Sequence, residues 1–150
     1  MKTLTNESDR REVLDRLTKL RIDSQRRWGR MTAHQMICHL SDSLRAALGE
    51  KQVSPNSSVF KRTIYKWAAL WVPLPWPHDI QTHPEIDQQQ GGPQPLEFAT
   101  DIETFRTLFN RYCGWKGDFA PHGKMGQMSR TERMRFAYLH IHHHFRQFSA

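Results

Sequence analysis

Residues 129–148 read SRTERMRFAYLHIHHHFRQF, and this stretch decides the fold class. Its apolar residues recur at intervals of three and four positions, as they do on the buried stripe of an amphipathic helix: Met134, Tyr138, Ile141, Phe145 and Phe148. Ser129 and Glu132 stand three positions apart just ahead of that stripe, which is the spacing of a capping box. The sequence therefore predicts a terminal helix that begins at this box.

The same start signal occurs twice more upstream. Thr32 and Gln35 have the capping-box spacing and precede a helical apolar stripe, which Gly49 can end as a left-handed cap. Thr100 and Glu103 have the same spacing in front of another helical stripe. We expect one helix to begin at each of these boxes.

Two further segments show helical periodicity without a capping box. One runs from Ser8 to about Arg27, and the other from about Ser58 to Val72. The strict alternation of apolar and polar residues that marks strands is absent from the sequence. The predicted fold class is all-α.

Five helical segments in 150 residues predict a four-helix bundle with one accessory helix, in a single domain over residues 1–150. A long connection, residues 73–99, is rich in Pro, Gly and Gln. Connections of this length are uncommon in compact domains and are often functional lids. Trp76 could pin this one onto the bundle and is a candidate pocket residue.

The chain has a net charge of +7 and a pI near 9.8, which raises the question of an acidic partner. Its basic residues are spread out and interleaved with acids, so nucleic-acid binding is not expected. The two cysteines form no CxxC pair, and the sequence shows neither a secretory signal nor an apolar run of about 18 residues. These features predict a soluble cytoplasmic protein without a membrane partner.

Four histidines crowd the terminal helix, and two of them can act together. On a helical wheel His140 and His144 lie one turn apart, on the same side of the apolar stripe and at its edge. His39 lies at the margin of the stripe of the helix that begins at Thr32. A histidine at such a margin is usually a packing residue. Three imidazoles from two helices, however, match the ligand set of a catalytic zinc-type ion with one open position.

Three polar residues are candidates for supporting this trio. Asp42, one turn beyond His39, could accept a hydrogen bond from the non-ligating ring nitrogen, or could be an exposed helix residue. Gln147, one turn after His144, could play a similar polar role. His122, in the loop before the last helix, could approach the open coordination side, or could be a simple turn residue.

The other nearby metal-binding side chains are expected to stay away from the trio. Cys38 is adjacent to His39, so it points about 100° away on the helix and should pack or face solvent. His34 lies in the capping turn, and His142 and His143 lie on the far side of the wheel. All three are expected to be exposed.

Four segments stand out as motifs: WGRMT at 28–32, QMICHL at 35–40, HGKMG at 122–126 and HIHHHFRQF at 140–148. Together they resemble the DinB-like superfamily over essentially the whole chain, and more narrowly an uncharacterised subfamily, a DinB-like domain of unknown function. That subfamily has a loop resembling HPxFG and an ending resembling HIDHHLRQF. The chain departs from this pattern at Gly123, Met125 and His142.

The resemblance implies an up-down-down-up four-helix bundle that binds a divalent ion, often zinc or nickel, at one end. By motif matching its ligands would be His39, His140 and His144. Characterised members include transferases that use bacillithiol or mycothiol and a mycothiol-dependent isomerase. The resemblance therefore implies S-transferase-type chemistry on a small molecule, with a low-molecular-weight thiol as co-substrate.

Two other functions remain open. Water in the open position would make the site a metal-dependent hydrolase, although no HExxH-type glutamate accompanies the trio. Alternatively the protein is a non-catalytic metal-binding or interaction bundle, and a homodimer is an open alternative.

Overall fold

The computed structural model describes residues 1–54, 59–72, 74–78, 87–88, 92 and 94–150, with side chains from residue 63 onward in the second range. This part of the chain contains five helices and no strand: α1 (Glu7–Leu17), α2 (Ala33–Ala47), α3 (Val59–Trp71), α4 (Phe98–Gly114) and α5 (Arg130–Gln147). Its one extended pairing is an isolated bridge between His122 and Gly126. The all-α prediction is confirmed.

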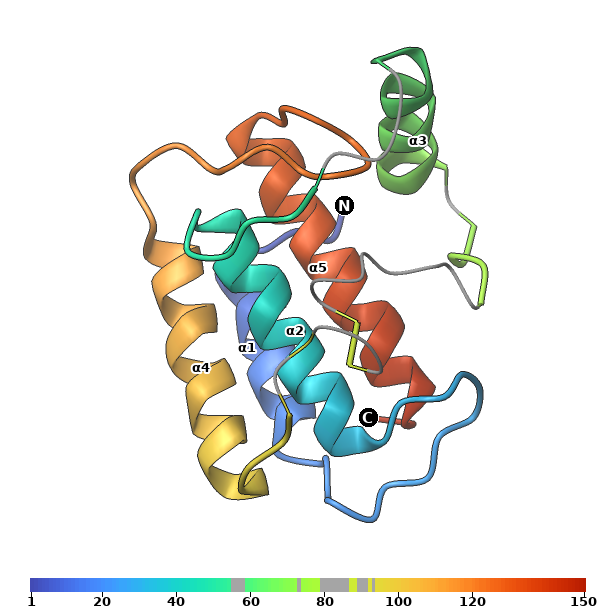
Figure 1. Cartoon of the computed structure of the whole chain (residues 1–150), viewed down its shortest axis with the longest axis vertical. Helices are drawn as coiled ribbons and strands as arrows, with labels where there is room; N and C mark the ends of the chain where they lie inside the picture. The colour runs from blue at the N-terminus through green and yellow to red at the C-terminus, as the bar shows by residue number, and fades with distance from the viewer. Residues whose placement is uncertain (55–58, 73, 79–86, 89–91, 93) are drawn as a thin grey trace.

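Four of the helices, α1, α2, α4 and α5, lie side by side, and α3 stands apart near the beginning of α5 (Figure 1). Within this group α2 packs along α4, and α1 packs along α5. The largest buried side chains between them are mainly aromatic: Phe105, Phe109, Tyr112 and Phe145. Burial of such aromatic area is the main stabilising contribution to a helical core of this size.

Two of the three predicted capping boxes are present, and one prediction was wrong. Thr32 and Ser129 each accept a hydrogen bond from the backbone N–H three residues on, and the side chain at that position bonds back. Helix α4, however, begins at Phe98 with Glu97 as its N-cap. The Glu97 carboxylate accepts from the backbone N–H groups of Ala99 and Thr100, at 3.0 and 2.6 Å. A charged acceptor placed three residues earlier thus takes over the role expected of Thr100.

The first helix ends ten residues before the predicted end near Arg27, because α1 stops at Leu17. The hydroxyl of Thr18 donates to the carbonyl of Asp15 at 2.7 Å, and the chain then turns away. Ile22, expected on the buried stripe, is 64% exposed. The segment from Thr18 to Thr32 therefore forms turns around the end of the bundle rather than more helix.

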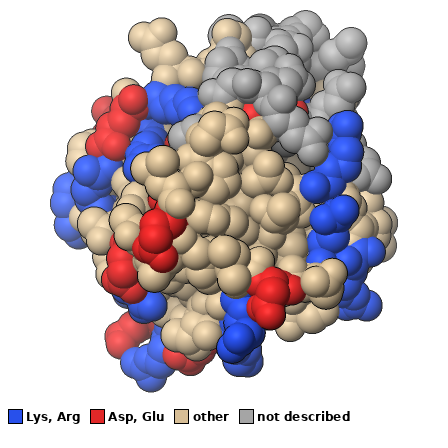
Figure 2. Space-filling model, turned by 60° about the horizontal axis from the view of Figure 1, so that its bottom comes forward, with Lys and Arg blue, Asp and Glu red and all other residues tan. Residues whose placement is uncertain are grey.

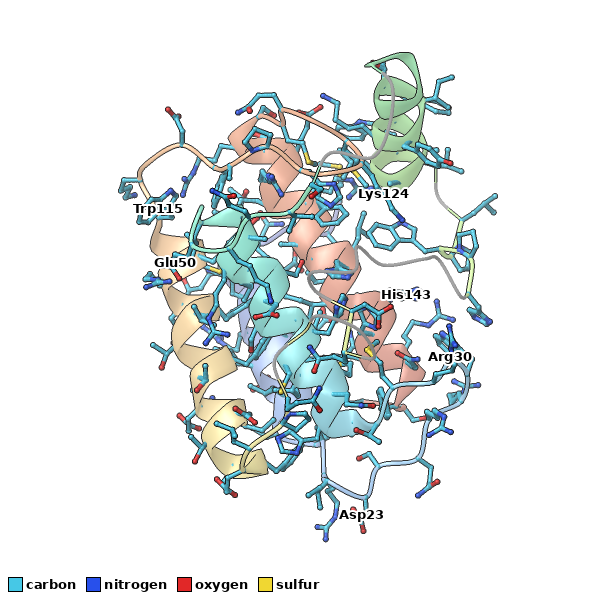
Figure 3. All side chains as sticks on the ribbon, viewed as in Figure 1. Asp23, Arg30, Glu50, Trp115, Lys124 and His143 are labelled. Carbon is cyan, nitrogen blue, oxygen red and sulfur yellow. The ribbon has the colours of Figure 1, made fainter. Side chains whose placement is uncertain are left out.

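This connecting segment is fastened to the end of α5. The backbone N–H of Arg27 donates to the carbonyl of Gln147 at 2.8 Å. Gly29 has a φ of +79°, and a Cβ there would lie 2.4 Å from the Gln147 side-chain nitrogen. Glycine is therefore required both by the backbone conformation and by the close approach. Asp23 and Arg30 lie on the outside of the segment, at the bottom of the view and at the lower right (Figure 3).

Helix α3 lies where the sequence predicted it, but most of its apolar side chains are exposed. Trp67 is 62% exposed, whereas Leu70 is fully buried against Met128 and Phe136. One face of α3 thus forms a small second core with α5 and the loop before it. None of the helices in the described ranges is long and apolar enough to cross a membrane.

Charged side chains are unevenly distributed over one end of the molecule. In Figure 2, Lys and Arg form a column along one side, while on the other side they alternate with Asp and Glu. The centre of that face carries few charged side chains. The excess positive charge of the sequence is thus concentrated partly along one edge of this face.

Candidate metal centre

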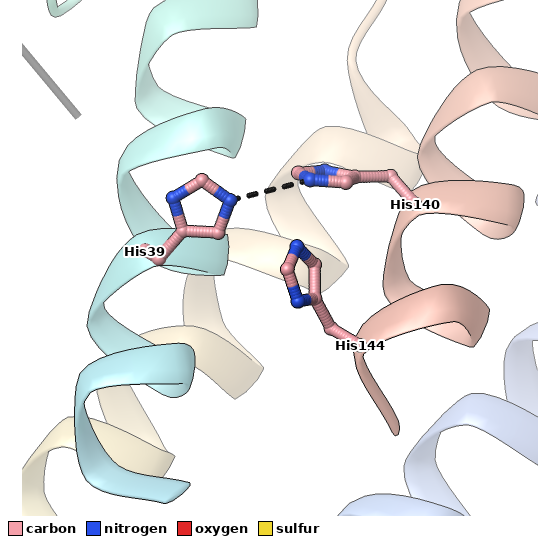
Figure 4. Close-up of side chains that lie close together, drawn as sticks. All are labelled: His39, His140 and His144. Carbon is pink, nitrogen blue, oxygen red and sulfur yellow. Dashed lines mark hydrogen bonds between the residues drawn. The ribbon is translucent and has the colours of Figure 1, made fainter. Parts of the chain in front are cut away.

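Three histidines converge between α2 and α5. Helix α2 supplies His39, and α5 supplies His140 and His144 one turn apart (Figure 4). The Nε2 atoms of His39 and His140 are 3.3 Å apart. One nitrogen from each of the three rings lies within 4.8 Å of the others. The structure therefore brings together the three residues selected on the helical wheel.

The three imidazoles are poorly solvated, and the neutral form is favoured for the two on α5. His39 is 2% exposed and His144 is 9% exposed, while His140 is partly buried. Burial lowers the pKa of His140 well below the usual value of an imidazole, and His144 and His39 lower it further. Burial and His39 likewise depress the pKa of His144. Neutral rings keep the lone pair that a metal ion requires.

The nitrogen spacing also fits a metal ion. Two nitrogens bound to zinc at 2.0–2.1 Å in tetrahedral geometry are about 3.3 Å apart. The His39–His140 separation of 3.3 Å matches this value. In the absence of an ion, the same distance suits a hydrogen bond from one neutral ring to the other. The donor set and its spacing are therefore compatible with a divalent ion bound by His39, His140 and His144.

Gln147 fixes the proton position on the His144 ring. Its side-chain nitrogen donates to the backbone carbonyl of Trp28 at 2.7 Å, which orients the amide. Its side-chain oxygen consequently faces Nδ1 of His144 at 3.1 Å and can only accept a hydrogen bond. The neutral His144 ring therefore carries its proton on Nδ1 and has its lone pair on Nε2. Metal-binding histidines are commonly oriented by such a bond to the second nitrogen.

Ser43 contacts the other α5 histidine and was not identified from the sequence. Its hydroxyl lies 3.3 Å from Nδ1 of His140. The signal was available, because Ser43 lies one turn after His39 and on the same side of α2. A hydroxyl can either donate or accept, so Ser43 is compatible with either tautomer of His140.

Aromatic side chains cover the trio on the side away from the core. Trp76 donates to the carbonyl of Ala69 at 3.0 Å, and its ring lies 6.2 Å from the His140 ring. Phe136 stacks on His140 with the ring centres 5.5 Å apart. Trp76 thus anchors the beginning of the 73–99 connection beside the trio. Positions 79–86, 89–91 and 93, which belong to the predicted lid, fall outside the described residues.

His143 belongs to the same aromatic cover, so its prediction as a surface residue was wrong. It is partly buried, and its ring lies 5.9 Å from each of the Trp28 and Trp76 rings. Burial, followed by the nearby His78, lowers the pKa of His143 to about 4. The helical wheel placed His143 opposite the core correctly, but it could not show that another segment packs there.

Two more histidines predicted to be exposed are partly buried. Arg16 donates to Nδ1 of His142 at 2.7 Å, which ties α1 to α5. His34 donates to the carboxylate of Asp101 on α4 at 2.7 Å. Cys38 is buried and directed towards the same Asp101. The expectation that Cys38 points away from the ion bound by the trio agrees with this placement.

The contacts of Asp42 and His122 do not test the supporting roles predicted for these residues, which therefore stay predictions. Asp42 is buried, and its two oxygens accept from Arg45 and Lys51 at 3.2 and 2.5 Å. His122 accepts from the backbone N–H groups of residues 124 and 125, and its ring packs edge-on against Phe136 at 4.7 Å. His122 therefore lies in a turn against Phe136, close enough to His140 to contribute to its lowered pKa.

The cavity that the described residues form beside His140 is small. A cavity of about 10 Å³ lies between α2, α4 and α5, next to Leu40, Tyr112, Arg133 and His140. Such a space holds a single water molecule. A larger cavity, of about 400 Å³, is lined by Lys66 and residues 117–119 and does not include the trio.

The fold and this site define an all-helical protein with a possible three-histidine metal centre. The chain belongs to the family described as protein of unknown function (DUF1569), whose sequence model matches residues 3–150. No curated protein and no solved structure matches the chain.

The depressed pKa values predict that the metal-free protein loses stability as the pH falls. In the unfolded chain a histidine binds a proton near pH 6.5, whereas His140 and His144 resist protonation in the native state. The unfolded state therefore binds more protons below about pH 6.5, and the free energy of unfolding decreases there. His142 and His143 shift in the same direction and add to the effect.

Urea unfolding in the presence of a chelator, at several pH values between 7.5 and 5.5, measures this loss. We expect the double variant His140→Gln, His144→Gln to lose less stability over this range than the wild type. An equal loss in both proteins would contradict the assignment of buried neutral rings.

Proposed function

We propose that His39, His140 and His144 bind one divalent metal ion, and that the protein is a metal-dependent enzyme. The observation that carries this proposal is the convergence of three poorly solvated ring nitrogens from two helices within 4.8 Å. Imidazoles at that distance repel each other when protonated, and a shared cation offsets the cost of burying them. Zinc and nickel are the ions that we expect, because both accept imidazole ligands.

We further propose that the chain is a single DinB-like domain over residues 1–150. The direction of the helices supports this kinship: α1 and α5 run down the page in Figure 1, while α2 and α4 run up. With α3 left out, that order of directions is the one expected of the DinB-like bundle. The position of the histidines on the second and last helices of this arrangement also agrees with the motif match.

The chemistry that we propose is S-transfer from a low-molecular-weight thiol to a small electrophile. A divalent ion held by three neutral imidazoles lowers the pKa of a thiol in its open position, which favours the nucleophilic thiolate. A thiol starts from a pKa of about 8.5 and water from about 15.7, so a bound ion would have to lower the pKa of a thiol much less, and the site suits a thiol better.

The protein side chains contribute orientation and exclusion of water. Gln147 holds the His144 ring in one tautomer, and Ser43 contacts the second nitrogen of His140. Trp76, Phe136 and His143 cover the trio and reduce the access of bulk water. A less hydrated site strengthens the interaction of an ion with an anionic thiolate.

Metal analysis of the freshly purified protein tests the ligand assignment. We expect His39→Ala, His140→Ala and His144→Ala each to contain one equivalent of divalent metal less per chain than the wild type. His142→Gln, a substitution on the same helix outside the trio, should keep the full amount. Equal metal contents in wild type and all three alanine variants would remove this proposal.

Gln147→Met tests the orienting bond. The substitution keeps the length of the side chain but removes both hydrogen bonds, to His144 and to Trp28. We expect the metal affinity of the trio, measured by competition with a coloured chelator, to fall about 10–100-fold. An unchanged affinity in a folded Gln147→Met protein would show that Gln147 does not orient the ligand.

A cobalt-substituted sample distinguishes an enzyme site from a structural one. The protein is Cys38→Ser, Cys113→Ser, so that an added small thiol is the only sulfur source. We expect addition of the thiol to produce a near-ultraviolet sulfur-to-cobalt absorption band, because the fourth position is open. The same titration with the His140→Ala variant is the control. A spectrum that does not respond to thiols would favour the non-catalytic alternative.

A further inference from the structure

A second cluster of metal-binding side chains lies on the opposite side of α2 from the trio. His34 and Cys38 stand one turn apart on α2, and Asp101 lies in the first turn of α4. Nε2 of His34 and Sγ of Cys38 lie 2.7 and 3.7 Å from the same carboxylate oxygen of Asp101. One nitrogen, one sulfur and one oxygen therefore converge within 4.8 Å.

We infer that His34, Cys38 and Asp101 form a second metal site, specific for a zinc-type divalent ion. A thiolate, an imidazole and a carboxylate are all zinc ligands, and the thiolate in particular selects against calcium and magnesium. Three protein ligands leave the fourth tetrahedral position to solvent. As the ion binds, the thiol proton of Cys38 passes to solvent and the sulfur coordinates as thiolate.

Two of the three separations between ligand atoms can be compared with those around a bound ion. With ordinary bond lengths, a sulfur and an oxygen on one tetrahedral zinc are about 3.6 Å apart, and a nitrogen and an oxygen about 3.3 Å. The Cys38–Asp101 separation of 3.7 Å already has the first value. The His34–Asp101 separation of 2.7 Å would have to open by roughly 0.6 Å, which the rotation of one surface-side ring can supply.

The site is placed on rigid elements and remains accessible. Helices α2 and α4 pack along each other, so the ligands are held by the bundle core. Cys38 is 6% exposed. The side chains of His34 and Asp101 are 12% and 18% exposed, which gives an ion a route from solvent. The backbone N–H of Leu96 donates to the same Asp101 oxygen at 3.2 Å and fixes the orientation of the carboxylate.

This inference is independent of the function proposed for the trio. Neighbouring helical residues point about 100° apart, so Cys38 faces α4 while His39 faces α5. The second ion would link α2 to α4 and hold the helix that carries His39. Its role is therefore structural support, and it stabilises the folded protein by binding the native state alone.

Cobalt binding tests the second site without interference from the trio. The protein is the double variant His140→Gln, His144→Gln, kept reduced with a phosphine rather than a thiol. We expect one equivalent of cobalt to produce a near-ultraviolet thiolate-to-cobalt band and to raise the unfolding temperature. Cys38→Ser and Asp101→Asn in this background should lose the band. Cys113→Ser, a substitution of the other cysteine, should keep it.

Two outcomes would overturn the inference. One is the absence of a thiolate band in the folded double variant, which would leave the cluster as a hydrogen-bonded contact between helices. The other is a band that persists in Cys38→Ser, since the sulfur would then come from elsewhere. Asp101→Asn keeps the size of the side chain, so it tests the site even where Cys38→Ser unfolds the chain. Circular dichroism verifies folding in each case.

Discussion

The close contact of three poorly solvated imidazoles is the constraint on which the region between α2 and α5 depends. Their rings are poorly solvated and lie with centres 4.8–5.2 Å apart. Protonation of more than one ring would place like charges close together in a poorly solvated region. The cost in free energy is on the order of several kcal/mol. The bundle is therefore stable in this arrangement only while the rings stay neutral or share a cation. The depressed pKa values of His140 and His144 express the same constraint.

The polypeptide around the trio maintains this arrangement through a short chain of hydrogen bonds. The Gln147 side chain connects the His144 ring to the backbone carbonyl of Trp28. The backbone carbonyl of Gln147 accepts a hydrogen bond from the backbone N–H of Arg27. The turn at Gly29 brings the connecting segment close enough for these bonds. The segment between α1 and α2 is thereby part of the site, although it supplies no ligand. A change in the path of this segment would alter the orientation of a ligand ring about 120 residues further along the chain.

Helix α2 supplies residues to both clusters of metal-binding side chains. It presents His39 to α5 and, one residue earlier, Cys38 to α4. The two faces differ in chemistry, because the first offers only imidazoles and the second offers a thiol, an imidazole and a carboxylate. A single helix can serve both faces because successive side chains diverge by about 100°. Its capping box at Thr32 fixes where the helix begins and hence the register of both sets of residues.

Local patterns in the sequence determined the helical class, the positions of α2 and α5, and the choice of His39, His140 and His144 as candidate ligands. These features depend on residues three or four positions apart, which the helix itself brings together. The tertiary structure alone decided where α1 ends, that Glu97 caps α4, and that His143 and Trp76 cover the trio. It also decided that Asp101 meets His34 and Cys38. The packing of His143 and the meeting of Asp101 with His34 and Cys38 depend on residues far apart in the chain, and periodicity along one helix carries no information about what packs against it. The cap at Glu97 and the end of α1 rest instead on bonds between residues two or three positions apart, which helical periodicity does not report.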